Sequence, residues 1–498
     1  MIEKNGEGIV TMITNHGYID NPTFRGMRWH LINSFNTIYI LDLHGNSKKK
    51  EISPDESKDE NVFDIQQGVA IIIAIKKGKA DKLADVYKSN MWGRRNKKFE
   101  ELNKHSIKNI FWKKVNLIEP FYMFVNTDIE LQKEYQKGIK INELFPINGV
   151  GITTAHDNLV IGDLKYSLIE NAKLFQNYNG SNFELCKELR IREKPGWNIT
   201  KARETLSKEY DLEKYITPIS YRPFDDKLIF YHDSLVWRSV KKIMKNFNQK
   251  ENIGLMVCRQ QKTSGFHHVL VHKNIIESSY VSNKTSEIGS SFPLYIYNES
   301  EESNLDKTKR HSNLNQILVK QLLINIEKYE WVDDHELKKN NNQISPLDIL
   351  DYVYAFLHSP KYRETYKDFL KIDFPRVPPA KNKEQFLKIA RLGSSLRKLH
   401  LMEDPELNTF STKFPIRGEN NVEKILFDGE KVWINNTQYF EGVSKTVWDF
   451  YIGGYQPVQK WLKDRKGRTL NFEDLTHYQK IIKSLETTIE VMKKIDEA

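Results

Sequence analysis

The residues best suited to chemistry in this chain are cations that gather in two short stretches. The stretch Trp237–Lys273 has eight Lys or Arg residues and a single acid, Glu251. The stretch Trp92–Lys114 has eight more, against Glu100 and Glu101. Aromatic side chains lie between the cations in both, and this mixture suits a nucleic-acid phosphate backbone. A solvated basic surface is the alternative, and composition alone leaves the two about even.

Other motifs that resemble binding sites are weak. The run Gly149–Gly151 is a Gly-x-Gly without the third glycine of a dinucleotide loop, so a plain turn is expected. His268 and His272 flank a strand-like Val-Leu-Val with no third ligand nearby, so they are interpreted as structural or DNA-facing and no metal site is predicted. In Asn21–Phe24, an Asn-Pro sequence before a helix favours Asn21 as the cap of an ordinary helix start.

Composition bounds the class of protein. A length of 498 residues predicts about three domains, and 39% hydrophobic residues with 11% aromatics indicate a folded chain. No apolar run approaches the roughly 20 residues of a membrane span, and the first residues do not read as a secretory signal. Two cysteines, Cys186 and Cys258, argue against a disulfide framework and favour a cytoplasmic protein. The net charge of +10 favours an anionic partner weakly.

The elements that must position these residues begin with an α/β pattern. Gly8–Thr14, Ile38–Leu43 and Val69–Ile75 are short apolar runs, as expected for strands buried on both faces. A helix is expected over Pro22–Phe35 because its apolar residues recur at helical spacing. The order strand, helix, strand is typical of a doubly wound sheet, although so few elements cannot cover both of its faces.

The rest of the chain alternates strand-like runs with polar turns and then becomes mostly helical. The expected strands are Phe121–Val125, Leu228–Tyr231, Gly254–Val257 and Phe292–Tyr297, followed by a polar linker over residues 298–312. Later elements are helices over 313–400, a hairpin turning at Asp428–Gly429 and a final helix over Phe472–Ile495. The predicted fold is therefore an α/β domain over 1–125, a mixed α+β domain over 126–300 and a mostly helical extension over 301–498.

An ordered series of segments resembles one known family. Gly8–Asn15, Phe24–Arg28, Tyr39–Asn46 and Asn61–Val69 are similar to the second half of the methyltransferase domain of type ISP restriction–modification enzymes, which join nuclease, helicase, methyltransferase and target-recognition parts in one polypeptide. The later segments resemble the C-terminal specificity domain of that family: Tyr221–Asp225, Phe292–Tyr297, Ser359–Arg363, Gly453–Tyr455 and Trp461–Arg468. The resemblance spans essentially the whole chain.

The departure from the family pattern matters as much as the likeness. In the family, a glycine-rich loop for S-adenosylmethionine and an Asn-Pro-Pro-Tyr tetrad both precede the strand that Gly8–Thr14 resembles, and neither is present here. The resemblance thus implies part of an adenine-specific DNA methyltransferase, with S-adenosylmethionine in the complete enzyme and no cofactor or catalytic residue in this chain alone. The expected partners are double-stranded DNA and an upstream chain carrying the missing half. A stand-alone DNA-binding protein without catalysis is the alternative.

The resemblance assigns a role to Phe63, and side-chain chemistry suggests roles for further residues. Adenine methylation needs the base to leave the stack, and Phe63 matches the place of an aromatic that contacts the flipped base. Its alternative is a core phenylalanine at a strand entry. Arg25 and Arg28 follow a helix start and suit phosphates, with surface ion pairs equally probable on sequence grounds. In the recognition domain, base and backbone contacts are expected from Arg222, Arg238, Lys241, Lys242, Lys245, Arg259, Gln260 and Lys262.

Two further expectations concern packing. Arg222 has a structural alternative, an ion pair with Asp225 or Asp226. The strand at Gly8–Thr14 lies mid-sheet in adenine methyltransferases, so its missing neighbour should leave an open edge beside exposed apolar side chains. Residues 1–80 are therefore expected to be the least stable part of the isolated chain.

Overall fold

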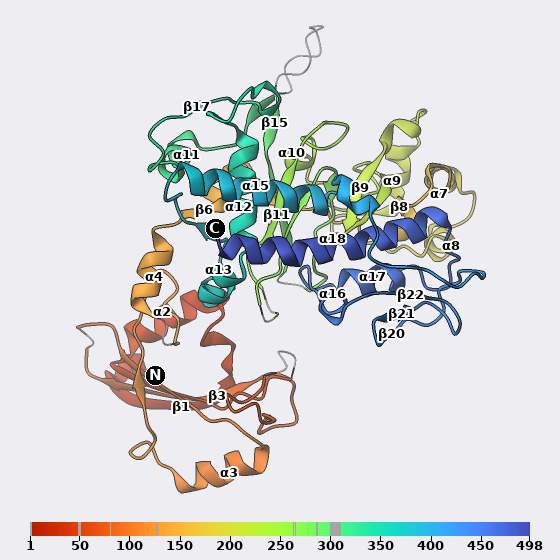
Figure 1. The fold of residues 1–498 in the computed structure, drawn as a ribbon. Helices are drawn as coiled ribbons and strands as arrows, with labels where there is room; N and C mark the ends of the chain where they lie inside the picture. The colour runs from red at the N-terminus through yellow and green to blue at the C-terminus, as the bar shows by residue number, and fades with distance from the viewer. Residues whose placement is uncertain are drawn as a thin grey trace. The chain divides into compact units, whose positions relative to one another are not determined.

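The computed structural model describes residues 2–47, 51–79, 81–125, 128–261, 263, 265–284, 287–298 and 310–498. The chain divides into two compact units, Met1–Glu134 and Tyr135–Ala498, called here the N-terminal and C-terminal units. Figure 1 shows the first in red to orange and the second in yellow to blue. Within the described residues no helix is long and apolar enough to cross a membrane.

The N-terminal unit is built on a mixed five-stranded sheet in the order β1-β3-β2-β4-β5. Strands β1 and β2 each pair antiparallel with β3, whereas β2 and β4 run parallel. A doubly wound sheet would have β3 parallel to β2, and this expectation is wrong. The connection from β2 to β3 has no crossover helix in its described residues, and a parallel pair needs such a crossover. The strands are β1 (Glu7–Asn15), β2 (Thr37–Asp42), β3 (Val69–Lys77), β4 (Asp85–Asn90) and β5 (Lys113–Lys114).

The strands predicted at Gly8–Thr14, Ile38–Leu43 and Val69–Ile75 and the helix predicted over Pro22–Phe35 are present with small shifts of their ends. The expectation that Gly8–Thr14 is buried on both faces is wrong, because β1 is largely exposed. The helix opens with a 3-10 turn, where Pro22 is the first residue and Asn21 Oδ1 accepts a hydrogen bond from Thr23 N at 2.9 Å. The capping interpretation of Asn21 is therefore confirmed. The helices are α1 (Ile2–Asn5), η1 (His16–Tyr18), η2 (Pro22–Phe24), α2 (Arg25–Ser34) and α3 (Arg95–Lys104), with α4 (Ile129–Gln136) at the junction of the units.

One expected strand is absent from this part of the chain, and one observed strand was not expected. Phe121–Val125 is not a strand. Phe124 lies in a loop, where its side chain is buried and its backbone N–H donates to Ile19 O. Strand β4, which lies between β2 and β5, was not predicted from the sequence, because Asp85–Asn90 has few apolar residues. Both misses share a cause, since pairing here depends on neighbours that lie far away in the sequence.

The C-terminal unit contains two four-stranded sheets, β13-β9-β10-β8 and β12-β11-β14-β7. The strand expected over Phe292–Tyr297 is divided at Leu294 into β14 and β15, and the other two predicted strands of this unit are confirmed. The strands are β6 (Ile139–Lys140), β7 (Gly149–Val150), β8 (Ile161–Gly162), β9 (Ile216–Arg222), β10 (Asp225–Phe230), β11 (Gly254–Cys258), β12 (Val269–His272), β13 (Ile275–Ile276), β14 (Gly289–Pro293), β15 (Tyr295–Tyr297), β16 (Arg310–Ser312), β17 (Glu330–Trp331), β18 (Gln343–Ile344), β19 (Arg376–Val377), β20 (Leu426–Asp428), β21 (Lys431–Trp433) and β22 (Tyr439–Glu441).

Long helices pack beside these sheets. Figure 1 shows α18 in dark blue running along α15, and both contact α12. The hairpin predicted at Asp428–Gly429 is confirmed, with Gly429 and Glu430 both at positive φ as a tight reverse turn requires. The helices are α5 (Ile141–Leu144), α6 (Asp157–Val160), α7 (Lys165–Asn177), α8 (Asn182–Glu188), α9 (Ile199–Leu206), η3 (Glu213–Tyr215), α10 (Lys241–Met244), α11 (Gln316–Leu322), η4 (His335–Leu337), α12 (Pro346–His358), α13 (Pro360–Thr365), α14 (Lys367–Leu370), α15 (Lys383–His400), η5 (Pro405–Asn408), α16 (Lys445–Trp448), α17 (Pro457–Lys463) and α18 (Phe472–Asp496).

The cores join segments that are distant in sequence. One cluster packs strands β9 and β10 against α18, and a second packs β11 and β12 against α12 and α15. Residues of the two sequence segments 126–300 and 301–498 thus contribute to the same hydrophobic clusters, within one compact unit.

Candidate nucleic-acid interface

The most basic predicted segment forms the short helix α10 and its approach. Ile243 and Met244 are buried, which turns Lys241 and Lys242 outward to solvent. Lys241 forms an ion pair with Asp233, and Lys245 is half-buried. The local pattern, apolar residues inward and lysines outward, produces a positive ridge of the kind that contacts phosphates.

Beside α10, cations flank an indole ring. The Arg238 guanidinium lies 4.5 Å from the centre of the Trp237 ring, and Lys194 Nζ lies 6.0 Å from it. The indole is fixed because Trp237 Nε1 donates to Pro195 O at 3.0 Å. Arg238 is exposed and has no carboxylate partner among the described residues. A cation held over an aromatic face in this way keeps its outward N–H groups available.

The predicted base-reading pair lies just after β11. Arg259 is exposed, and its Nε donates to Asp373 Oδ1 at 2.8 Å. Asp373 also binds Lys140, at 2.6 Å, so this carboxylate bridges two cations and the trio keeps a net positive charge. Gln260 is half-buried, while the neighbouring Gln261 is buried. Lys262 lies outside the described residues.

Arg222 does not belong to an exposed interface. It is nearly buried and donates to Glu277 Oε2 at 2.8 Å, and its guanidinium stacks 3.9 Å from the Tyr221 ring. The expected partners were Asp225 or Asp226, but Asp225 pairs instead with Arg465, at 2.7 Å. Burial raises the pKa of Glu277 above its ordinary value, and the charge of Arg222 opposes that rise. The structural interpretation of Arg222 is thus correct, with a different partner.

The two arginines near the start of α2, both predicted to contact phosphates, also differ in exposure. Arg25 is exposed at the start of α2. Arg28 is fully buried, and its guanidinium donates to Tyr18 O, Asn21 O and Phe121 O at 2.7–2.9 Å. Burial lowers the pKa of Arg28 to about 10. The prediction that Arg28 contacts a phosphate is wrong, because its donors already satisfy three backbone carbonyls.

Phe63 lies on the loop that precedes β3. Its side chain is 43% exposed, which argues against the alternative of a core phenylalanine. Asn61 Oδ1 accepts from Phe63 N at 2.9 Å, and Arg95 Nη2 donates to Phe63 O at 3.1 Å. The backbone is therefore held on both sides while the ring stays outside the core. Its contact with a flipped base remains a prediction.

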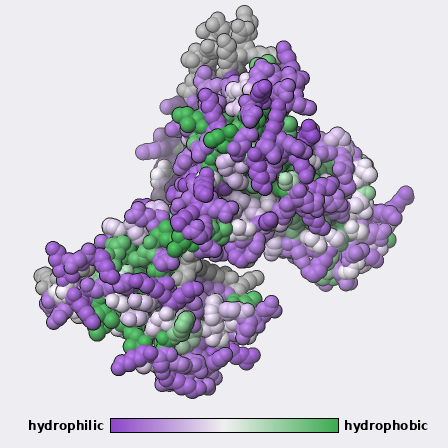
Figure 2. All heavy atoms as spheres, turned by 60° about the vertical axis from the view of Figure 1, so that its left-hand side comes forward, coloured by the Kyte–Doolittle hydropathy of each residue, from purple (hydrophilic) through white to green (hydrophobic). Residues whose placement is uncertain are grey.

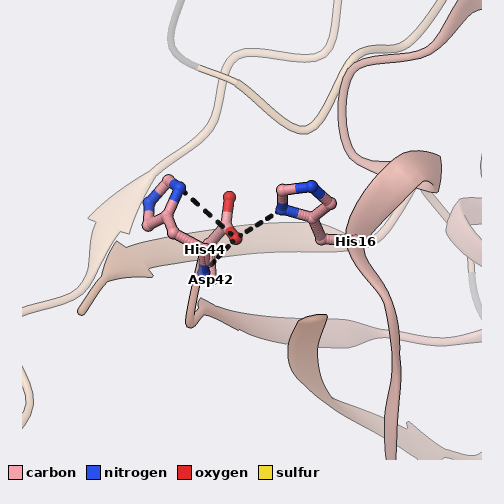
Figure 3. Close-up of side chains that lie close together, drawn as sticks. All are labelled: His16, Asp42 and His44. Carbon is pink, nitrogen blue, oxygen red and sulfur yellow. Dashed lines mark hydrogen bonds and ion pairs between the residues drawn. The ribbon is translucent and has the colours of Figure 1, made fainter. Parts of the chain in front are cut away.

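A cluster that sequence patterning missed lies at one end of the same sheet. His16, Asp42 and His44 are buried, and each offers a donor atom within 4.8 Å of the others. His16 Nδ1 lies 3.0 Å and His44 Nδ1 3.8 Å from Asp42 Oδ1, and Figure 3 shows the two imidazoles on either side of the carboxylate. The sequence offered one signal, which was position: His16 directly follows β1, Asp42 is the last residue of β2, and His44 lies two residues after it. Strands β1 and β2 point the same way.

The electrostatics of this cluster centre on Asp42. Burial acts to raise the pKa of Asp42, but the hydrogen bond of His16 and the charge of Lys88 hold it well below its ordinary value. Lys88 Nζ lies 3.1 Å from Asp42 Oδ2, the oxygen that faces away from the imidazole contacts. The carboxylate is therefore ionised and engaged through both oxygens.

The histidines considered earlier as a pair are structural. His268 contacts Gln261 and Glu287, and His272 contacts Asn274 O and Ser291 Oγ, and both side chains are fully buried. A DNA-facing role is therefore wrong for both. Among the described residues neither belongs to a group with metal-ligand geometry.

The surface itself is mostly polar. Figure 2 shows hydrophilic side chains over most of the face drawn, with separate apolar patches between them. In the N-terminal unit the exposed apolar residues include Ile9, Met12 and Ile13 of β1, at 50–65% exposure. Strand β1 ends the sheet order, with β3 as its neighbour among the described residues. The expected open edge beside exposed apolar side chains is confirmed.

Solved structures share this fold. The chain is similar to the ATP-dependent Type ISP restriction-modification enzyme LlaBIII bound to DNA (TM-score 0.71, 18% identity, 98% of this chain and 33% of that one). It is also similar to a nuclease-deletion mutant of the Type ISP enzyme LlaGI in complex with a DNA substrate mimic (0.68, 18%, 98% and 39%). A third likeness is to the DrdV–DNA complex (0.69, 19%, 99% and 50%). The chain thus spans one third to one half of these proteins.

A sequence family gives the narrower assignment. No curated protein matches the chain. The profile of the Type ISP C-terminal specificity domain matches residues 143–494, which is most of the chain and nearly all of the C-terminal unit. The segments after Tyr221 that resembled this domain in sequence all lie inside the match. The chain therefore belongs to the Type ISP C-terminal specificity domain family.

Proposed function

We propose that this chain recognises a specific sequence in duplex DNA for a restriction–modification system. The family assignment of residues 143–494 carries the proposal. The structures of similar fold are complexes with DNA or a DNA mimic, which supports the same class of ligand. The charge of +10 agrees with a polyanionic partner.

The contacts divide by chemistry. Lys241, Lys242 and Lys245 of the α10 ridge, with Arg238 beside it, would bind phosphates and fix the orientation of the duplex. Arg259 and Gln260 would read base edges, since Arg matches guanine and Gln matches adenine in the major groove. Arg259 would have to leave or share Asp373 to reach a base, and this exchange would penalise non-matching DNA.

Duplex binding at several salt concentrations tests this proposal. Charge reversal of Lys241, Lys242 and Lys245 should weaken binding to all sequences and flatten the salt dependence, by about one unit of slope for each lost phosphate contact. Arg259→Ala or Gln260→Ala should instead relax preference at one base pair by roughly 1–3 kcal/mol. Reversal of the exposed Lys381, Lys388 and Lys493 is the charge-matched control. Equal losses in the control and in the α10 variant would contradict the assignment.

We also propose that the N-terminal unit is the second half of an adenine-N6 methyltransferase domain. The open edge of β1 supports this, because a further strand would pair with β1 there, and elements packed on the two faces of the sheet would cover Ile9, Met12 and Ile13. The exposed, backbone-anchored Phe63 suits contact with a flipped base. The segment that supplies the β1 neighbour would also carry the S-adenosylmethionine loop and the amino-group tetrad, either on a partner chain or on the same polypeptide.

Methyl transfer from tritiated S-adenosylmethionine to mixed-sequence duplex DNA tests the second proposal. The 498-residue chain alone should transfer no methyl groups and bind no cofactor. Addition of a segment with the missing loop and tetrad should restore both, and Phe63→Ala should then reduce transfer more than DNA binding. Robust transfer by the chain alone would contradict the proposal.

The alternative is a DNA-binding protein without catalysis. It predicts the same binding and salt dependence, but no cofactor binding under any pairing. The two candidates therefore separate on S-adenosylmethionine binding in the presence of a complementing segment.

A further inference from the structure

The His16–Asp42–His44 cluster has a position that the proposed DNA contacts do not use. It lies where β1, β2 and β4 all reach their carboxyl ends, because β1 and β2 both run opposite to β3 and β4 runs parallel to β2. His16 follows β1, Asp42 is the last residue of β2 with His44 two residues after it, and Asn90 is the last residue of β4. The topology thus delivers side chains from three strands to one buried point.

The hydrogen bonds of His44 fix where its protons lie. Its Nε2 is 3.0 Å from Asn90 Oδ1, an atom that only accepts, so Nε2 carries the proton. The other nitrogen, Nδ1, is buried and has no hydrogen-bond partner. It faces Asp42 Oδ1 at 3.8 Å and Glu51 Oε1 at 3.9 Å. In the neutral ring, a lone pair therefore points at two carboxylates in a place that water does not reach.

Among the described residues, no cation lies between these donors. Lys88 does not provide one, because its ammonium binds Asp42 Oδ2 and not the oxygen that faces the imidazoles. The separations of 3.0, 3.8 and 3.9 Å bracket the donor-to-donor distance of about 3.4 Å expected around a tetrahedral zinc with bonds near 2.1 Å. Two imidazoles with one carboxylate are a common ligand set for divalent transition metals.

We propose that His16, Asp42 and His44 bind a divalent transition-metal ion, with Glu51 as the nearest fourth donor, and that Zn²⁺ is the preferred ion. His16 would bind through Nδ1, with its proton moved to Nε2, where a rotated Asn46 amide can accept it. Asn90 and Lys88 are the outer partners that hold His44 and Asp42 in place.

The proposed site stands next to the loop of Phe63. Asn61 Nδ2 donates to Gly45 O at 3.1 Å and to Gln67 O at 2.6 Å, which ties that loop to the residue after His44. Gly45 has a φ of +81° and a Cβ there would lie 2.4 Å from Asn61 Cα, so the two segments are in close contact. A bound ion would therefore rigidify the segment that presents Phe63.

Metal content is the direct test, on the full untagged chain and without DNA. After exposure to Zn²⁺ and removal of excess, about one ion per chain is expected by elemental analysis. His16→Gln, Asp42→Asn and His44→Gln should each lower the affinity of the chain for Zn²⁺ by about tenfold or more, which is the order of loss seen when even an outer partner of a metal ligand is removed. His105→Gln, an exposed histidine of the same unit, is the matched control and should keep the ion.

A second measurement covers variants that fold poorly. The Trp92 ring stacks on His44 with centroids 3.3 Å apart, so Co²⁺ at the site should quench Trp92 fluorescence in the unmodified chain. Trp92→Phe should abolish this quenching while the visible absorption of tetrahedral Co²⁺ persists. Absence of both stoichiometric Zn²⁺ and the Co²⁺ spectrum from the unmodified chain would overturn the proposal. DNA binding is measured in a separate assay, so failure of the metal proposal and failure of the DNA-recognition proposal can be told apart.

Discussion

At the scale of single residues, exposure separates arginines that the sequence treats alike. Arg25 and Arg28 are three positions apart near the start of one helix, yet one faces solvent and the other binds three backbone carbonyls. Arg222 is likewise committed to Glu277, whereas Arg238 rests on an indole face. Only the exposed members of these pairs remain candidates for phosphate or base contacts.

Substitution of the two helix-start arginines should give opposite outcomes. Arg28→Met leaves the carbonyls of Tyr18, Asn21 and Phe121 without donors in a buried place, and should cost about 2–4 kcal/mol of stability, in the range known for lost hydrogen bonds to charged groups. Arg25→Met should change stability by less than about 0.5 kcal/mol, as at most surface sites. Urea unfolding measures both, and equal effects would show that Arg28 is not the structural residue described.

Acid should destabilise the C-terminal unit through His400. This buried ring accepts from the Tyr354 hydroxyl and contacts Thr488, and burial with the charge of Arg363 lowers its pKa to about 3. The unfolded chain protonates near pH 6.5, so the stabilisation is complete above that pH and is lost as the pH falls below it. At pH 5 the loss is about 2 kcal/mol.

Unfolding at pH 7 and pH 5 checks this through a matched pair. His400→Gln keeps hydrogen-bonding groups but cannot titrate, so its pH dependence should be flatter by that amount, whereas the exposed His105→Gln should behave like the unmodified chain. An unchanged pH dependence in His400→Gln would contradict a lowered pKa.

At the scale of elements, the strand β1 is the least completed part of the N-terminal sheet. It pairs with β3 on one side, and side chains of both its faces are exposed, Ile9 and Ile13 on one and Met12 on the other. Strand β2 differs, because β3 and β4 flank it. Fast hydrogen exchange is therefore expected in β1 and not in β2. The sequence alone led us to expect low stability over all of residues 1–80, whereas the structure restricts this expectation to β1.

The open edge should also promote self-association. Ile13→Lys places a charge on an edge strand and should reduce concentration-dependent association, because charged side chains oppose strand pairing. Phe183→Lys removes a similarly exposed apolar side chain from α8 in the C-terminal unit and is the control. Sedimentation velocity over a range of concentrations measures the effect. Identical behaviour of the two variants would show that the β1 edge is not the adhesive surface.

At the scale of the whole molecule, the division into Met1–Glu134 and Tyr135–Ala498 predicts separate behaviour. The C-terminal unit has two large hydrophobic clusters, whereas the clusters of the N-terminal unit are small. Calorimetry should therefore show two transitions, with the N-terminal unit unfolding first. Saturating duplex DNA should raise the later transition more, since binding stabilises the unit that binds. One cooperative transition would contradict the independence of the units.

The sequence by itself determined the features that depend on near neighbours. The positions of the apolar strands, the Asn21 cap, the Asp428–Gly429 turn and the long final helix follow from local periodicity and local hydrogen bonds, so they were predictable. The exposure of β1 was not, because it depends on which segments pack against that strand. Only the tertiary structure shows which charged side chains are free to contact a ligand and which are committed to partners inside the protein. Glu277 meets Arg222 across 55 positions of sequence, and His16 meets Asp42 across 26. Burial and partner choice depend on how distant segments pack, and that information does not reside in any short stretch of the chain.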